Sequence, residues 1–281
     1  MKSSEKTVNS DTWSTSGQLG AKRLLSSFLA LPDSSTLPHA FIFLGPSGVG
    51  KFKLAEEFAI KIAQVWNNQS EKYVYDFSED NGLDELRELI KLSSLTSVGE
   101  GRKIFILKNF ELASSSSVNA LLKTLEEPSR GSMFLLVSNT NGALPTIMSR
   151  AIAVRCFPLS QNVETVLPKL LADSIVGFPE LQKQFERDSK SAETYNNLLT
   201  DLVNSHSVGE SLTKLSSLIE LDSNELRLLL NLYANLLKRQ LGNESSVGNI
   251  AKSLRAIQTA HTELNHNFNT KLVLQEMLIN S

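Results

Sequence analysis

The chain has 281 residues, 41% of them hydrophobic, which is long enough for more than one domain with a buried core. Its 28 basic and 30 acidic residues give a formal charge of −2, so any contact with nucleic acid would need a local basic patch. The single cysteine, Cys156, excludes an internal disulfide and a multi-cysteine zinc site.

Residues 1–16 are rich in Ser, Thr, Asn and Lys and lack the apolar core of a secretory signal, so we expect a flexible N-terminal tail. A helical repeat of apolar residues follows at 18–31, and Pro32 ends it. No apolar stretch reaches the roughly twenty residues needed to cross a bilayer. The sequence therefore predicts a cytoplasmic protein without membrane contact.

Short, wholly apolar runs then alternate with helical segments. The first run, at 40–44, has the composition of a strand buried on both faces of a parallel sheet, and a helix is expected at 51–66. Similar runs occur at 73–77, 104–107, 134–137 and 152–154. This alternation predicts an α/β domain with a parallel sheet.

The apolar runs stop after Pro158, and only helical periodicity continues. Two amphipathic helices, expected at 247–264 and 270–279, are the segments that leave room for a partner. The predicted organisation is a tail at residues 1–16, an α/β domain at 17–158 and two helical domains at 159–206 and 207–281.

A glycine-rich loop joins the first strand to its helix. It contains Gly45, Gly48 and Gly50 and ends at Lys51. Between a buried strand and a helix, backbone N–H groups and a lysine of this kind cradle phosphates. The loop therefore predicts a P-loop that requires no cofactor, with weak binding of ATP or ADP left open.

The residues that would hold magnesium in such a site are missing. The position after the lysine needs a hydroxyl ligand, yet it is Phe52. The strand at 103–107 is followed by Lys108 and Asn109, where an acidic ligand and a base belong. Glu111 is the nearest carboxylate, and we expect it to be solvated or to cap a helix. The sequence predicts no metal site and no intrinsic catalysis.

The segments Asn119–Pro128 and Leu144–Arg150, together with the strand between them, resemble the clamp-loader branch of the AAA+ ATPases. Gly17, Gln18 and His39 match the same branch, and the resemblance covers about residues 13–157. It implies an AAA+ P-loop domain with a parallel sheet, followed by a helical lid and collar. It also implies a place in the DNA polymerase III clamp loader and thus in DNA replication.

The resemblance implies roles for particular residues. Ser149 and Arg150 match the family's Ser-Arg-Cys motif, whose arginine reaches in trans into a neighbouring subunit's active site, while Ala151 replaces the cysteine. Asn139 lies where AAA+ ATPases place a polar residue that senses the γ-phosphate. Many members bind zinc through cysteines after the P-loop helix, but residues 67–72 hold none, so zinc is not expected.

The same resemblance implies partners. We expect a non-hydrolysing subunit that joins gamma/tau-type ATPase subunits and delta-type subunits in a hetero-oligomeric ring, and that meets the sliding clamp and primed DNA through the assembly. Two alternatives stay open: a working P-loop enzyme, either a clamp-loader ATPase or a small-molecule kinase, and a structural adaptor with a vestigial P-loop. Phe52, Lys108 and Asn109 argue against the first, and Arg150 argues against the second.

Overall fold

The computed structural model describes residues 13–66, 70–78, 83–95, 102–139, 145–159, 165–204, 218–240, 247–265 and 268–280. They belong to two compact units, Met1–Leu159 and Ser160–Ser281, which are treated separately below. The predictions made for the tail at 1–12, for the cysteine-free segment at 67–69 and for Leu144 lie outside the described residues.

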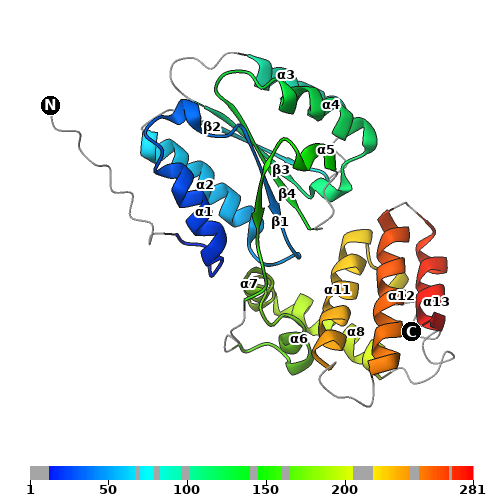
Figure 1. The fold of residues 1–281 in the computed structure, drawn as a ribbon. Helices are drawn as coiled ribbons and strands as arrows, with labels where there is room; N and C mark the ends of the chain where they lie inside the picture. Colours follow the sequence, from blue (N-terminus) through cyan, green and yellow to red (C-terminus); the bar gives the residue numbers. More distant parts are fainter. Residues whose placement is uncertain are drawn as a thin grey trace. The chain divides into compact units, whose positions relative to one another are not determined.

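A five-stranded sheet forms the centre of the first unit (Figure 1). Its strands are β1 (Ala40–Leu44), β2 (Glu71–Asp76), β3 (Lys103–Lys108), β4 (Ser132–Ser138) and β5 (Ile152–Arg155). They lie in the order β2-β3-β4-β1-β5, and all four neighbouring pairs are parallel. The predicted parallel α/β domain is confirmed, and β1 has the predicted bounds.

Helices cover both faces of the sheet, which explains why its central strands are largely apolar. Helices α1 (Leu19–Leu29) and α2 (Lys51–Trp66) lie on one face; α3 (Leu83–Ser94), α4 (Ser115–Glu126) and the short α5 (Pro145–Met148) lie on the other (Figure 1). All residues of β1 and β4 are buried. The central strands therefore form a rigid base for the loops that follow them.

Because every strand pair is parallel, the carboxyl ends of the strands share one edge of the sheet. The glycine-rich loop follows β1, a 3₁₀ turn η2 (Phe110–Leu112) follows β3, and Asn139 follows β4. Ligands of open α/β sheets bind at this edge. The fold thus brings the predicted P-loop, the end of β3 and Asn139 together.

The secondary structure described in the second unit is helical. Its helices are α6 (Lys169–Ser174), α7 (Pro179–Arg187), α8 (Ser189–Val203), α11 (Ser223–Gln240), α12 (Val247–Asn265) and α13 (Thr270–Asn280). Helix α11 contacts α6, α8 and α12. The division of this unit into a lid at 159–206 and a collar at 207–281 stays a prediction. None of the helices that the structure describes is long and apolar enough to span a membrane.

Candidate functional site

The glycine-rich loop has the backbone of a phosphate-binding turn. Gly48 and Gly50 have φ angles of 79° and 92°, in the left-handed region that favours glycine. At Gly45 a Cβ atom would lie 2.2 Å from the Cys156 carbonyl oxygen, so no larger residue fits there. The loop is tied to β5 at this point, because the Cys156 N–H donates to the Leu44 carbonyl at 2.8 Å.

Lys51, the first residue of α2, is buried and folded back onto its own loop. Its Nζ donates to the Pro46 carbonyl at 2.5 Å and to Asn139 Oδ1 at 2.8 Å. Burial lowers the pKa of Lys51 to about 8, while the Glu111 carboxylate opposes the shift. The structure therefore joins two of the predicted residues, Lys51 and Asn139, by a direct hydrogen bond.

Glu111 lies at the same site, contrary to the prediction of a solvated or capping glutamate. Its Oε2 accepts a hydrogen bond from the Asn139 backbone N–H at 2.9 Å. The turn η2 places Glu111 here by directing the chain back toward β4 after β3 ends. Glu111 was not predicted at the site because it follows the end of the strand by several residues in the sequence. The 3₁₀ turn keeps it close to the strand end in space.

The residues where P-loop enzymes place magnesium ligands do not fit the ion. The Lys108 ammonium lies 4.8 Å from the centroid of the Phe52 ring, so a fixed cation and a hydrocarbon face stand where oxygen ligands would be needed. Within the described ranges, no group of three or more His, Cys, Asp or Glu residues could hold a metal ion.

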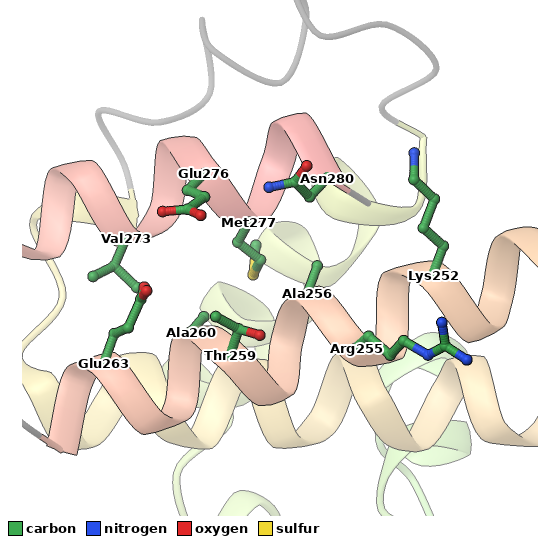
Figure 2. Close-up of a pocket in the computed structure, with 10 residues that line it drawn as sticks. All are labelled: Lys252, Arg255, Ala256, Thr259, Ala260, Glu263, Val273, Glu276, Met277 and Asn280. Atoms are coloured by element: carbon green, nitrogen blue, oxygen red, sulfur yellow. The ribbon is translucent and has the colours of Figure 1, made fainter.

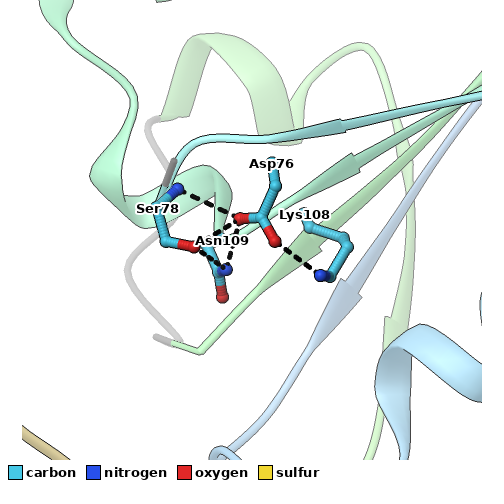
Figure 3. Close-up of polar contacts among 4 residues, drawn as sticks. All are labelled: Asp76, Ser78, Lys108 and Asn109. Carbon is cyan, nitrogen blue, oxygen red and sulfur yellow. Dashed lines mark hydrogen bonds and ion pairs between the residues drawn. The ribbon is translucent and has the colours of Figure 1, made fainter. Parts of the chain in front are cut away.

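Asp76, at the end of β2, holds both residues that follow the core of β3 (Figure 3). Its carboxylate accepts hydrogen bonds from Lys108 Nζ at 2.5 Å and from Asn109 Nδ2 at 2.6 Å. The Ser78 hydroxyl and backbone N–H also donate to it, at 2.7 and 3.0 Å. Burial opposes ionisation of Asp76, but the hydrogen bonds from Lys108, Ser78 and Asn109 outweigh it and lower its pKa to about 2.

This network gives Lys108 and Asn109 a structural role, because both are held by Asp76. Asn109 has a φ angle of 51°, a left-handed conformation that asparagine tolerates better than most residues. The Asn109 amide is oriented toward Asp76, away from the role of a base. Asp76 was not predicted as a site residue. The only signal in the sequence was a carboxylate at the end of a predicted strand, and its pairing beside β3 became visible in the structure.

Arg150 belongs to a separate part of the first unit, just after α5. Its Nη1 donates to the Thr146 carbonyl at 2.7 Å and to Ser149 Oγ at 2.9 Å, and its Nη2 pairs with Glu126 Oε1 at 2.5 Å. The Arg150 side chain is 30% exposed. Its Nε atom is buried and has no hydrogen-bond partner among the described residues. Arg150 and Ser149 are thus in contact, and both contact α5.

Two residues that matched the clamp-loader branch have identifiable structural roles. Gln18 has a φ angle of 56°, and its side chain bonds both backbone groups of Phe157, at 3.0 Å to the N–H and 2.6 Å to the carbonyl. Its Nε2 also donates to the Val49 carbonyl of the P-loop at 3.2 Å. His39 Nε2 lies 2.9 Å from the Leu125 carbonyl at the end of α4. These contacts tie α1 and α4 to the loops around β1 and β5.

Comparison with known proteins identifies the family. The sequence pattern of the family described as "DNA polymerase III, delta subunit" matches residues 20–160, half of the chain. The chain belongs to this family. It is a clamp-loader protein of the delta-prime-like kind, with the AAA+ α/β domain that this family implies.

Curated relatives of this delta-family chain are replication proteins. The DNA polymerase III subunit delta′ of Pseudomonas aeruginosa is 31% identical over 140 residues, 42% of this chain and 43% of the relative. Subunit tau of Bacillus subtilis is 30% identical over 131 residues, 40% and 23% of the two chains. Replication factor C subunit 3 of Saccharomyces cerevisiae is 26% identical over 148 residues, 51% and 42% of the two chains. The matches span less than half the length of these relatives.

Solved structures also resemble the delta-family chain. A DNA polymerase III gamma subunit-related protein of Thermotoga maritima superposes with a TM-score of 0.40 and 18% identity, over 92% of this chain and 97% of that one. A RuvB mutant of the same organism has a TM-score of 0.44 and 15% identity, over 85% and 83% of the two chains. The fold assignment rests on the sheet order and the family match, since these scores are low.

The second unit of the delta-family chain has a groove between α12 and α13 (Figure 2). Lys252 and Arg255 lie at one end, and Glu263 lies at the other. Beside this groove, α13 is apolar on more than one side. Its inner residues Val273, Leu274, Met277 and Leu278 are buried, whereas Phe268, just before the helix, and Leu272 and Ile279 are exposed.

Proposed function

We propose that this chain is a non-hydrolysing delta-prime-like subunit of the DNA polymerase III sliding-clamp loader, which supplies Arg150 in trans to a neighbouring ATPase subunit. The observation that carries the proposal is the contact of the Lys108 ammonium with the Phe52 ring, in a P-loop whose backbone is otherwise complete. A family member with this contact keeps the AAA+ domain for assembly but does not catalyse phosphoryl transfer at its own P-loop.

The loss of hydrolysis follows from the chemistry of the site. Phosphoryl transfer needs a metal to bridge the phosphates and a residue to position the attacking water. Phe52 offers no oxygen, and the Lys108 ammonium beside it would repel a divalent cation. The Asn109 side-chain amide donates a hydrogen bond to the Asp76 carboxylate. ATP or ADP could bind only weakly and without magnesium, through the backbone N–H groups and Lys51, and neither zinc nor another cofactor is required.

Arg150 is suited to act on a neighbour instead. Its guanidinium is permanently charged and planar, a geometry that matches phosphate oxygens. The side chain is partly exposed just after α5. In ring-forming ATPases such an arginine stabilises the charge that develops on the transferred phosphoryl group. Ser149 acts with it by accepting a hydrogen bond from Nη1.

Assembly would use the second unit. The exposed stripe at α13 is formed by Phe268, just before the helix, and by Leu272 and Ile279 within it, and α13 also lines the groove with α12. Exposed apolar stripes of this kind mark sites of protein association. We assign this surface to the collar, where it would bind gamma/tau-type ATPase and delta-type subunits in a cytoplasmic hetero-oligomeric ring that engages the sliding clamp and primed DNA. The names of the relatives, subunits delta′ and tau, support these partners.

The direct test is to purify tagged protein from its own cells and identify the chains that accompany it by mass spectrometry. We expect a gamma/tau-type ATPase and a delta-type subunit in stoichiometric amounts. The separated protein should hydrolyse no ATP above background, with or without magnesium. Recovery without clamp-loader chains would refute the assembly, and turnover near that of an active subunit would favour a working ATPase.

A further inference from the structure

We propose that Glu126 is a positioning residue for Arg150, which it holds in the orientation needed to reach the neighbouring subunit. This inference rests on the proposed function of Arg150 in trans. Its basis is the ion pair between Arg150 Nη2 and Glu126 Oε1, 2.5 Å apart, which joins the turn after α5 to the last residue of α4.

The contacts of Arg150 divide into two kinds. Those of Nη1, to the Thr146 carbonyl and Ser149 Oγ, are made within its own helical turn and move with it. The contact of Nη2 with Glu126 is made to a different helix, 24 positions away in the sequence. Glu126 is therefore the group that fixes the guanidinium plane relative to the body of the domain.

The end of α4 is a firm base for this contact. Leu121 and Leu125 of the same helix are buried in the core between α4 and the sheet. The Leu125 carbonyl, next to Glu126, accepts a hydrogen bond from His39 Nε2 at 2.9 Å. His39 directly precedes β1. At the other end, Ser114 caps the helix by accepting a hydrogen bond from the Ser117 N–H at 3.1 Å. The carboxylate of Glu126 thus projects from a helix held at both ends.

The arrangement leaves two N–H groups of Arg150 without a partner among the described residues: the second N–H of Nη2, and the buried Nε. The guanidinium has five N–H groups, and Nη1 uses two of them while Nη2 uses one on Glu126. A long arginine side chain without such anchors loses orientation through its rotamer freedom. Because charge stabilisation in the transition state depends on exact placement, Glu126 would raise the rate without touching the nucleotide.

The test uses the reconstituted clamp loader with the full-length chain, carrying Glu126→Ala, Glu126→Gln or the double change Glu126→Ala with Arg150→Ala. Glu127→Ala is the matched control, since Glu127 is the next residue, is exposed, and forms no ion pair with the described residues. The measured quantity is the DNA-dependent ATPase activity that is lost in the Arg150→Ala complex. Its kcat and KM for ATP are determined separately. Assembly of each complex is checked by size-exclusion chromatography.

We expect Glu126→Ala to lower kcat of that activity by about tenfold with KM unchanged, because the finger is misplaced and the ATP site itself is intact. Glu126→Gln, which keeps an acceptor oxygen of the same reach, should recover most of the rate. The double variant should be no slower than Arg150→Ala alone, since Glu126 acts through Arg150. Glu127→Ala should match the wild type.

A wild-type rate for Glu126→Ala would overturn the positioning role, and a faster rate would mean that Glu126 restrains the arginine. In either case a slow Arg150→Ala complex would leave the proposed function standing. If Arg150→Ala itself has no effect, the proposed function fails first. If the Glu126→Ala complex does not assemble, Glu126→Gln is measured in its place. A rate as slow as that of Arg150→Ala contradicts the proposal. A wild-type rate also contradicts it if the effects of Glu126→Gln and Arg150→Ala are additive in the double variant.

Discussion

Lys108 lies over the face of Phe52, with its ammonium 4.8 Å from the ring centroid and its other side paired with Asp76. The two residues occupy the positions of two metal ligands, on α2 and at the end of β3. Sequence reasoning treats them as separate losses. The structure joins them in one interaction, since a fixed cation is stabilised by the ring and by the carboxylate.

This coupling predicts that a single reversion does not restore hydrolysis. Phe52→Thr supplies a hydroxyl, but the Lys108 ammonium remains and repels a divalent ion. We expect ATP turnover of the purified variant to stay at background in a magnesium titration, with a small decrease in thermal stability from the lost cation–π contact. Magnesium-dependent turnover near one per second would contradict this account.

The Asp76 network predicts a stability effect that depends on burial. Lys108→Met should lower the free energy of unfolding by roughly 1–3 kcal/mol, because it leaves the Asp76 carboxylate, only 10% exposed, without its counter-charge. Asp76→Asn in the same chain should recover part of the loss. Lys72→Met is the control, since its pair with Glu56 is 41% and 32% exposed and should contribute no more than about 1 kcal/mol. Equal losses in urea unfolding would refute the role of burial.

His261 in α12 predicts a loss of stability in mild acid. Burial lowers its pKa to about 4, and the positive charges of Arg227 and Lys238 act in the same direction. An unfolded histidine titrates near pH 6.5, so below that pH the unfolded chain takes up a proton that the folded chain refuses, down to about pH 4. Stability should therefore fall with pH across this window, by about 2 kcal/mol between pH 7.5 and 5.

The variant His261→Gln removes this titration, so its unfolding free energy should decline less over the same interval. The measurement is urea unfolding at pH 7.5, 6.5, 5.5 and 5. The same pH dependence in the variant and the wild type would show that His261 does not carry the effect.

The exposed stripe of α13 predicts a variant that folds but does not assemble. Leu272 is 64% exposed, so Leu272→Asp should leave the circular dichroism and melting temperature nearly unchanged while preventing co-elution with the ATPase subunits. Val166→Asp is the control, because Val166 is 93% exposed in the same unit and lies away from α13 in sequence. Normal co-elution of Leu272→Asp would remove this surface from the interface.

Much of the first unit could be predicted because its signals are local. The apolar run of β1 and the glycines after it define a strand, a turn and a helix start within a dozen residues, and the structure has them at the predicted positions. Strand β2 was predicted at 73–77 and begins earlier, at Glu71, because its first residues are exposed at the sheet edge and do not form an apolar run.

The contacts that determine the site's chemistry were less predictable, because they join distant segments. Asp76 meets Lys108 only after β2 and β3 pair in register. Glu111 reaches Asn139 through a 3₁₀ turn, and Glu126 reaches Arg150 across two helices. A sequence motif marks Arg150, but nothing in its neighbourhood along the chain identifies the residue that orients it.

In the proposed function, Arg150 acts in trans while the chain's own P-loop hydrolyses no ATP. An arginine finger contributes on the order of a thousandfold to the rate at the site that it serves. Arg150→Ala should therefore abolish most ATP hydrolysis at the active site of one neighbouring subunit. Arg150→Lys should recover little, because an ammonium lacks the planar fork. Lys51→Met, which keeps the buried stem, should have almost no effect.

The most direct measurement is clamp loading and DNA-dependent ATPase activity of reconstituted complexes that carry Arg150→Ala or Lys51→Met, with assembly verified for each. We expect Arg150→Ala to lower total ATPase activity by about the share of one site and to lower clamp loading much further, while Lys51→Met loads clamps at the normal rate. Normal loading by Arg150→Ala together with failure of Lys51→Met would contradict the proposed function, since the active and the vestigial residue would then be exchanged.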